Sequence, residues 1–400
     1  MQISVNSAIS VLVLTACTFP SWKNPSGNAS DAGGSNSSSE QTCADSRGVC
    51  FLAPELTTVS WGLTSITFRS SPVQSSTPTI ILASNGSSEI IELKHDKSQM
   101  VEIDRLNVTP PPWQALGGDF NLDGKEDYVV ACPGTASQLG VLSIWLGHQA
   151  DKWSNALTQP LGLGTYAAAV RQVPVSEEVF AVGASYNAQL LLPVVAHKGA
   201  SPTPGKSVAL DFTPTAVEFA TNAAGTTQLF AVGSTSGRGK LIAFGITGET
   251  LTQIAGYDAL GTSPNDVKVA DINGDSRLDA VVVDDSDQSR LYSLLGESSN
   301  LRSTTKQLDL PPHSHAVTIS DFDRDGYADV ATISGSTSTI QVCFGDGTGV
   351  FGECVQVPHA LEQPTDLVAF DSDADGWVEF FAIGYEGQLS RVQLGPARDK

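Results

Sequence analysis

The sequence predicts an all-β fold, a seven-bladed β-propeller of four-stranded blades, from three observations. Short apolar runs typical of buried strands start at residues 80, 128, 180, 230, 280, 330 and 380, so the repeat is close to 50 residues. Each repeat holds four strand-like pieces separated by polar or Gly-rich turns. In four repeats an acidic loop directly precedes the apolar run. Four-stranded units repeated at this period form the blades of a propeller.

Composition agrees with a globular β-protein and excludes one class of partner. The 400 residues include 37 Gly and 21 Pro, with 40% hydrophobic and 16% charged residues, as expected for a core with many turns. The formal net charge is -21, and 14 of the acids lie at positions 1, 3, 5 and 9 of the four acidic loops. A chain this acidic is a poor binder of phosphate backbones, so we expect no nucleic-acid partner.

The N-terminus predicts export. Residues 1–16 contain the apolar run Ala8–Leu14, which is too short to span a bilayer and is typical of a signal peptide. The run leads into Leu14–Cys17, which resembles the lipobox of bacterial lipoproteins. That resemblance implies lipidation of Cys17 and, with Thr18 next, a lipid anchor in the outer membrane of the cell envelope. The alternative is an ordinary cleaved signal. Residues 1–10 lack Lys and Arg, which departs from the pattern and leaves the true start codon open.

The next elements are a tether and the propeller itself. Residues 17–47 are rich in Ser, Gly and Asn and predict a flexible tether, and residues 48–400 hold the repeats. The seventh repeat has a third strand at Gln388–Leu394, but only Gly395–Lys400 follow. We therefore predict that the apolar segment Val49–Leu52 supplies the missing fourth strand and closes the ring.

Cysteine usage fits an oxidising compartment. Cys43 and Cys50 lie close together in sequence, and Cys343 and Cys354 flank an expected hairpin turn. Each pair could form a disulfide, although sequence leaves the pairing open. Cys132 lies in an apolar strand, where we expect a small buried hydrophobe and not a reactive thiol.

The acidic loops predict metal binding. In the third loop, Asp321, Asp323, Asp325 and Asp329 occupy positions 1, 3, 5 and 9, and Gly326 occupies position 6. Alternating carboxylates repel one another unless a cation lies among them. Hard oxygen ligands at this spacing suit Ca²⁺, and Gly allows the sharp turn around the ion. Position 12 lies in a strand and is never Glu, which argues against EF-hands. The alternative for each loop is a solvated polar turn.

These loops resemble the FG-GAP/VCBS repeats of integrin α-subunit-type propellers, and Phe344–Gly352 resembles the turn between the third and fourth strands of that family. The resemblance covers residues 48–400, departs from the pattern at Ser276, and implies about four structural Ca²⁺ sites. Repeats one, three and four lack the acids. The expected ligands are the side chains at positions 1, 3, 5 and 9 and the backbone carbonyl at position 7: Asp119, Asn121, Asp123, Lys125 and Asp127; Asp271, Asn273, Asp275, Arg277 and Asp279; Asp321, Asp323, Asp325, Tyr327 and Asp329; and Asp371, Asp373, Asp375, Trp377 and Glu379.

No catalytic motif is recognisable, so we expect a protein that is not an enzyme. The sequence has no G-x-S-x-G, no H-E-x-x-H and no phosphate-binding Gly loop. We expect the loops that lead into the first strands to gather on the face opposite the acidic turns as a binding surface. Packing of Trp61 and Trp113 between blades, and an incidental His313 and His315, are the simpler alternatives. The candidates are Trp61, Trp113, Gln114, Tyr166, Asn265, Asp266, His313, Ser314, His315, Thr365 and Asp366.

Two functional hypotheses follow. The first is a calcium-stabilised, surface-anchored module without enzymatic activity that binds a protein partner or mediates adhesion. The second is a lectin-like propeller that binds glycans in pockets between blades, which aromatic residues facing those pockets would support. An enzyme would need a cofactor or a convergent acid–base pair that the sequence does not reveal.

Overall fold

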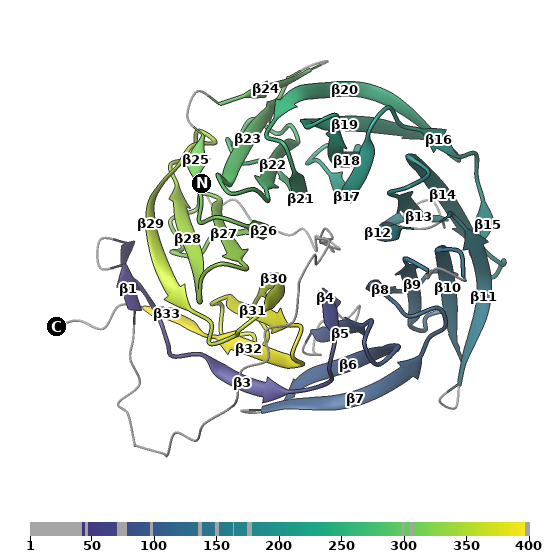
Figure 1. Cartoon of the computed structure of the whole chain (residues 1–400), viewed down its shortest axis with the longest axis horizontal. Helices are drawn as coiled ribbons and strands as arrows, with labels where there is room; N and C mark the ends of the chain where they lie inside the picture. Colours follow the sequence, from purple (N-terminus) through teal and green to yellow (C-terminus); the bar gives the residue numbers. More distant parts are fainter. Residues whose placement is uncertain are drawn as a thin grey trace.

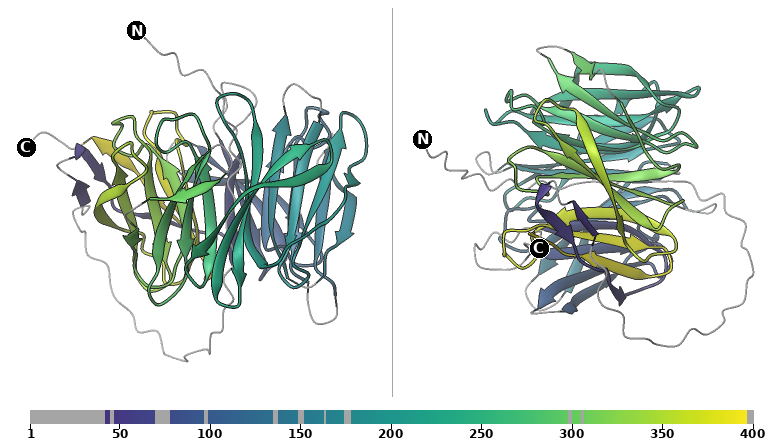
Figure 2. Two further views of the ribbon diagram at one scale, coloured as in Figure 1. Left: turned by 90° about the horizontal axis from the view of Figure 1, so that it is seen from above. Right: turned by 90° about the vertical axis from the view of Figure 1, so that its left-hand side faces the viewer.

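The computed structural model describes residues 42–44, 47–69, 78–96, 99–134, 138–148, 152–162, 164–173, 178–297, 300–304 and 307–396. The expected export signal and Cys17 lie outside these residues. The described part of the chain contains no helix that could cross a membrane. Its strands form seven antiparallel sheets arranged in a ring, which confirms the seven-bladed β-propeller (Figure 1). Figure 2 shows the same ring from its edge.

Within each blade the strands follow one another outward from the axis. The blades consist of β4 (Leu63–Arg69), β5 (Thr79–Ser84), β6 (Glu89–Asp96) and β7 (Gln99–Asn107); β8 (Gln114–Gly118), β9 (Asp127–Cys132), β10 (Val141–His148) and β11 (Lys152–Pro160); β12 (Thr165–Val173), β13 (Glu178–Ser185), β14 (Leu190–His197) and the short pieces β15 (Thr203–Pro204) and β16 (Val208–Ala209); β17 (Thr213–Thr221), β18 (Thr227–Thr235), β19 (Arg238–Thr247) and β20 (Thr250–Leu260); β21 (Pro264–Ala270), β22 (Asp279–Asp284), β23 (Arg290–Gly296) and the short β24 (Leu301–Ser303) and β25 (Leu308–Asp309); β26 (Ser314–Ser320), β27 (Asp329–Ser334), β28 (Thr339–Gly345) and β29 (Phe351–Pro358); and β30 (Pro364–Phe370), β31 (Glu379–Gly384), β32 (Gln388–Val392) and β3 (Glu55–Thr58).

The hydrophobic core lies between the faces of adjacent blades. The second strands β22, β27 and β31 are buried along their whole length, because a neighbouring blade covers each face. This explains why they are continuous apolar runs and do not alternate with polar residues. One cluster joins the sixth and seventh blades through Phe322 and Phe380, whose ring centroids are 4.8 Å apart. Burial of a side chain of this size stabilises a fold by about 2–3 kcal/mol.

An N-terminal strand closes the ring, as predicted, but it is not the strand we expected. β3, and not Val49–Leu52, pairs with β32 and completes the seventh blade (Figure 1). The apolar segment instead forms β2 (Val49–Phe51), which pairs with β1 (Thr42–Ala44) and β33 (Leu394–Pro396) in a separate three-stranded sheet.

The physical reason is burial. The outermost strand of a blade faces solvent on its outer side, and β3 has mostly exposed side chains. Val49 and Phe51 are fully buried, and the ring of Phe51 lies 6.1 Å from that of Phe380. The apolar segment Val49–Phe51 therefore packs against the seventh blade in a separate sheet, and the more polar β3 forms the outer strand of that blade.

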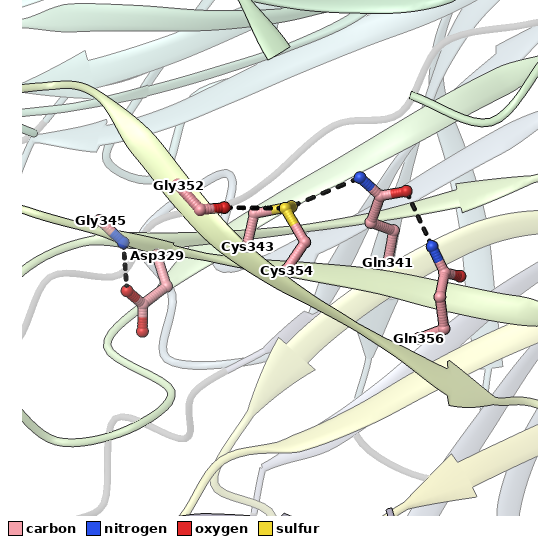
Figure 3. Close-up of a disulfide and its surroundings, with 7 residues drawn as sticks. All are labelled: Asp329, Gln341, Cys343, Gly345, Gly352, Cys354 and Gln356. Atoms are coloured by element: carbon pink, nitrogen blue, oxygen red, sulfur yellow. Dashed lines mark hydrogen bonds between the residues drawn. A yellow bond between two sulfur atoms is a disulfide. The ribbon is translucent and has the colours of Figure 1, made fainter. Parts of the chain in front are cut away.

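Two disulfides join residues that face each other on neighbouring strands. Cys43–Cys50 links β1, which lies inside the range we expected to be tether, to β2, and Cys343–Cys354 links β28 to β29 (Figure 3). These pairings resolve the choice that the sequence left open. Cys132 is a free, buried thiol whose pKa burial raises to about 12, which agrees with the small hydrophobe expected there.

Candidate metal sites in the acidic loops

The four acidic loops connect the first and second strands of their blades, as predicted: β8 to β9, β21 to β22, β26 to β27 and β30 to β31. First strands run in the same direction in every blade of the ring. The four loops therefore lie on one face of the propeller.

The loops share one backbone shape that places two residues in the left-handed region. In the third loop these are Arg324 at position 4, with φ of 64°, and Gly326 at position 6, with φ of 91°. In the second loop they are Gly274, with φ of 76°, and Ser276, with φ of 66°. Ser276 thus departs from the sequence pattern without changing the conformation. In the second loop Gly occupies position 4 and Ser276 occupies position 6, so the cost of a left-handed backbone moves from position 4 to position 6.

Hydrogen bonds to the backbone orient the acids at positions 1, 3 and 5. Asp321 accepts the N–H of Asp325 and of Gly326, both at 3.0 Å, through its two oxygens. Asp323 Oδ1 also accepts the Asp325 N–H at 3.1 Å, and Asp325 Oδ1 accepts the N–H of Tyr327 at 2.8 Å. Oxygens of Asp321, Asp323 and Asp325 lie within 4.8 Å of one another.

The fourth loop brings Asp371, Asp373 and Asp375 together in the same way. Asp371 Oδ1 is buried, and within the described residues it has no hydrogen-bond partner. An unsatisfied buried carboxylate oxygen among other carboxylates fits a hard cation such as Ca²⁺. In the first two loops Asn121 and Asn273 replace the acid at position 3, and their amide carbonyls are also hard oxygen donors.

The acids at position 9 do not join these clusters. Asp329 Oδ2 accepts the Phe322 N–H at 2.8 Å, and its Oδ1 accepts the N–H of Gly345, at the end of β28, also at 2.8 Å (Figure 3). Asp127 and Asp279 make the equivalent bonds. These hydrogen bonds fasten the loop to the third strand, and the expected role of the position-9 acids as metal ligands stays a prediction.

Glu379, at position 9 of the fourth loop, is bonded differently. It accepts the Ser372 N–H at 2.7 Å and a hydrogen bond from the Arg391 guanidinium at 2.6 Å. Arg391 also lies 3.2 Å from Asp373 and 3.5 Å from Glu55 on the closing strand β3. The fourth loop is therefore linked electrostatically to the closure of the ring.

A glycine at the end of the third strand completes three of the loops, and we missed it as a site residue. A Cβ on Gly345 would lie 2.1 Å from the carbonyl oxygen of Ala328, and Gly147 and Gly296 meet Glu126 and Leu278 at 2.1 and 2.3 Å. The backbone of the position-8 residue lies so close to this glycine that no side chain fits there. The signal was present in the sequence as a Gly that follows the position-9 acid by 16 to 20 residues.

A basic side chain touches each acidic loop. Lys125 and Arg277, at position 7, bind the position-5 carboxylates of their own loops at 3.3 and 2.8 Å. Arg47, in the N-terminal hairpin, lies 3.4 Å from Asp323 and 3.3 Å from Asp325. These cations offset part of the acidic charge.

Position 7 also fits a role for the backbone alone. The N–H of Lys125, Arg277, Tyr327 and Trp377 each donates to the position-5 carboxylate of its loop. Their side chains differ in kind and environment. Tyr327 is half exposed, and Trp377 lies 5.0 Å beneath the Arg324 guanidinium.

Burial makes the position-9 acids hard to ionise. It raises the pKa of Asp127 and Asp279 to about 6 and that of Asp329 to about 7, against the opposing effect of their backbone donors. Neighbouring loop carboxylates raise these pKa values further. A bound cation would favour the charged forms.

Five of the residues that we expected on a binding surface of the opposite face instead join neighbouring blades. Gln114, Asp266 and Asp366 are fully buried and accept N–H groups from the first strand of the next blade, at 2.8, 3.0 and 2.9 Å. Asn265 and Thr365 likewise donate to backbone carbonyls of the neighbouring blade. These residues lie just inside the first strands, where their polar groups join blades and do not face a ligand.

The remaining candidates on that face differ from one another. Trp61 is 55% exposed and packs edge-to-face on Tyr385, with ring centroids 5.3 Å apart, whereas Trp113 is half-buried. His313 lies between two surface carboxylates, and His315 is buried with Nδ1 bonded to the carbonyl of His313. The side chain of Tyr166 is outside what the structure describes.

Comparison with known proteins supports the repeat assignment. Residues 271–332 and 321–382, which contain three of the acidic loops, match the FG-GAP-like repeat. No curated protein matches the chain.

Solved structures share the fold. The protein is similar to BBS1N, solved in complex with ARL6DN, with 12% identity over 86% of this chain and 95% of that chain, and a TM-score of 0.56. It is also similar to a putative 6-phosphogluconolactonase from Bacteroides uniformis (14% identity, 76% and 96% coverage, TM-score 0.53) and to a functionally unknown protein from Desulfotomaculum acetoxidans (10%, 80% and 98%, 0.52). At these identities the likeness shows the fold alone.

Proposed function

Because this chain is a seven-bladed β-propeller of the FG-GAP/integrin type, we propose that it is a calcium-stabilised, surface-anchored module that binds a protein partner and catalyses no reaction. The observation that carries the proposal is the recurrence of the same oxygen-rich loop on one face of four blades. Propellers with FG-GAP repeats are suited to protein binding because a rigid ring presents many loops in fixed positions.

Calcium would be held in each loop by the oxygens at positions 1, 3 and 5 and by the carbonyl at position 7. Asp371 Oδ1, which has no hydrogen-bond partner in the described part of the chain, supports this assignment most directly. The ion would supply positive charge that offsets carboxylate repulsion, while the position-9 acid keeps the loop fastened to its blade. Binding to the folded state alone stabilises a protein by about 2.7 kcal/mol per site when the ligand is at 100 times its Kd.

Isothermal titration with CaCl₂ and thermal unfolding in calcium and in EDTA test this part of the proposal. We expect a higher melting temperature with calcium, and Asp371→Ala should lose one equivalent of bound ion. Asp309→Ala is the matched control, because Asp309 is 88% exposed and lies outside the loops. Equal melting temperatures in calcium and EDTA, with no heat of binding, would contradict calcium stabilisation.

The lack of enzymatic activity is proposed because the sequence holds no catalytic motif and two of the acids near the axis are engaged between blades. Asp266 and Asp366 are used in bonds between blades and are not free to act on a substrate. Cross-linking of the full chain in intact cells, with and without calcium, would identify a protein partner. If calcium-loaded protein yields no cross-linked partner, the protein-binding proposal fails.

The surface anchor rests on the sequence alone. We propose that Cys17 carries the lipid, because it follows an apolar run in a lipobox-like context. Cys17→Ser should move the protein from the membrane fraction to the soluble fraction. If that variant still sediments with membranes, the anchor lies elsewhere.

Lectin activity is the second candidate, and the exposed Trp61–Tyr385 pair favours it. Aromatic faces of this kind stack on sugar rings. A glycan array with the wild-type chain and Trp61→Ala tests the idea, and Tyr327→Ala, an exposed aromatic of the third acidic loop, is the control. Saturable binding that Trp61→Ala alone abolishes would make the protein a lectin.

A further inference from the structure

A cavity of about 150 Å³ lies on the axis of the ring, between first strands of five blades. Figure 1 shows these strands, β4, β17, β21, β26 and β30, around the centre. Each contributes to the lining: Phe68, Glu218, Lys268, Thr318 and Val368, respectively. The cavity is mostly apolar, with its charged groups on β17 and β21.

The charged groups leave one acceptor unsatisfied. Lys268 Nζ lies 2.8 and 2.9 Å from the two oxygens of Asp266 but 4.0 Å from Glu218 Oε2. Glu218 Oε1 accepts the Val269 N–H at 3.2 Å, which ties blade four to blade five. Glu218 Oε2 is buried without a hydrogen-bond partner within the described residues, and the whole side chain is 1% exposed. An unsatisfied buried oxygen calls for a donor.

We propose that this cavity binds a small primary alkylammonium ion, whose N–H groups donate to Glu218 Oε2 and whose alkyl group packs against Phe68 and Val368. A cavity of about 150 Å³ accommodates a molecule the size of benzene, so four carbons and a nitrogen fit. Calcium does not fit here, because it needs six to eight oxygen ligands and the described lining offers side-chain oxygens from only Glu218 and Thr318. Lys268, itself an alkylammonium held by Asp266, shows that this environment accepts such a group.

The charge state of Glu218 determines the pH range in which the cavity can bind an alkylammonium ion. Burial raises its pKa to about 8; Lys268 opposes that shift, and Asp266 adds to it. An ammonium ion binds the carboxylate form, so affinity should increase as pH rises through about 8 and level off above it. It should fall again above about pH 10, where alkylammonium ions lose their proton.

Isothermal titration with butylammonium chloride at pH 9 tests the proposal on the full chain. We expect saturable one-to-one binding to the wild type and at least tenfold weaker binding to Glu218→Gln, which keeps the size and the Oε1 acceptor. Glu362→Gln, at an exposed glutamate, should bind as the wild type does. Tetramethylammonium chloride, which carries the charge but has no N–H, should not bind.

A second variant decides the matter if Glu218→Gln does not fold. Ala369→Leu adds volume to the cavity lining without touching the charged groups, and it should also abolish binding. Absence of saturable binding to the wild type would overturn the proposal and leave a cavity that holds water. Equal affinity in wild type, Glu218→Gln and Ala369→Leu, or equal binding of tetramethylammonium, would overturn it as well.

Discussion

Replacing Gly345 with Ala should destabilise the sixth blade by about 3 kcal/mol. The new Cβ would lie 2.1 Å from the carbonyl oxygen of Ala328 and 3.2 Å from its carbon, so backbone must move by close to an ångström. Overpacking of this kind costs about 1–3 kcal/mol. The same movement lengthens the 2.8 Å bond from the Gly345 N–H to Asp329, and an unsatisfied buried acceptor costs about 1–3 kcal/mol more.

Urea unfolding followed by tryptophan fluorescence measures this loss. Gly352→Ala is the matched control, because it lies on the next strand of the same blade and its Cβ would meet nothing within 4 Å. We expect Gly352→Ala to stay within about 0.5 kcal/mol of the wild type. If Gly345→Ala unfolds at the same urea concentration as Gly352→Ala, the close backbone approach does not restrict this position to Gly.

Three further predictions concern the ring and its channel. Removing residues 42–58 deletes the closing strand, so the melting temperature should fall and light scattering should show association through the unpaired edge of β32; a monomer with unchanged melting would contradict this. Replacing Cys343 and Cys354 with Ala should lower stability by about 3 kcal/mol in urea unfolding, given their separation of 11 residues, and equal stability of variant and oxidised wild type would contradict this. Glu218 has an ordinary pKa of 4.5 that folding raises to about 8, so the unfolded chain loses its proton first and wild-type stability falls as pH rises between these values. Relative to Glu218→Gln this loss is on the order of 5 kcal/mol, and identical pH profiles in urea unfolding would refute it.

Local patterns predicted most of the fold. Continuous apolar runs such as Ala280–Val283 mark strands that are covered on both faces, and their regular spacing gave the number of blades. The closing strand was misassigned because Val49–Leu52 is more apolar than Glu55–Thr58. Apolar character predicts burial, but it does not say which partner provides that burial.

The candidate site was predicted in part. The acids at positions 1, 3 and 5 of the third loop converge, as alternating carboxylates in a tight turn must. Asp329 follows the same spacing, and its oxygens accept backbone N–H groups from Phe322 in the loop and from Gly345 on the third strand. Asp266 was expected at a surface but joins two blades. Sequence spacing gives the distance along one loop, whereas these contacts come from strands that only the fold brings near.

The sequence by itself determined the class of fold, the repeat, the position of the acidic loops and the shared shape of their turns, because these depend on residues within a few positions of one another. The tertiary structure decided which strand closes the ring, which acids point inward and where an unsatisfied carboxylate meets a cavity. Glu218 is an example, because its environment comes from five blades that are far apart in the chain. Burial and pairing across the ring, which no short segment contains, set the role of such residues.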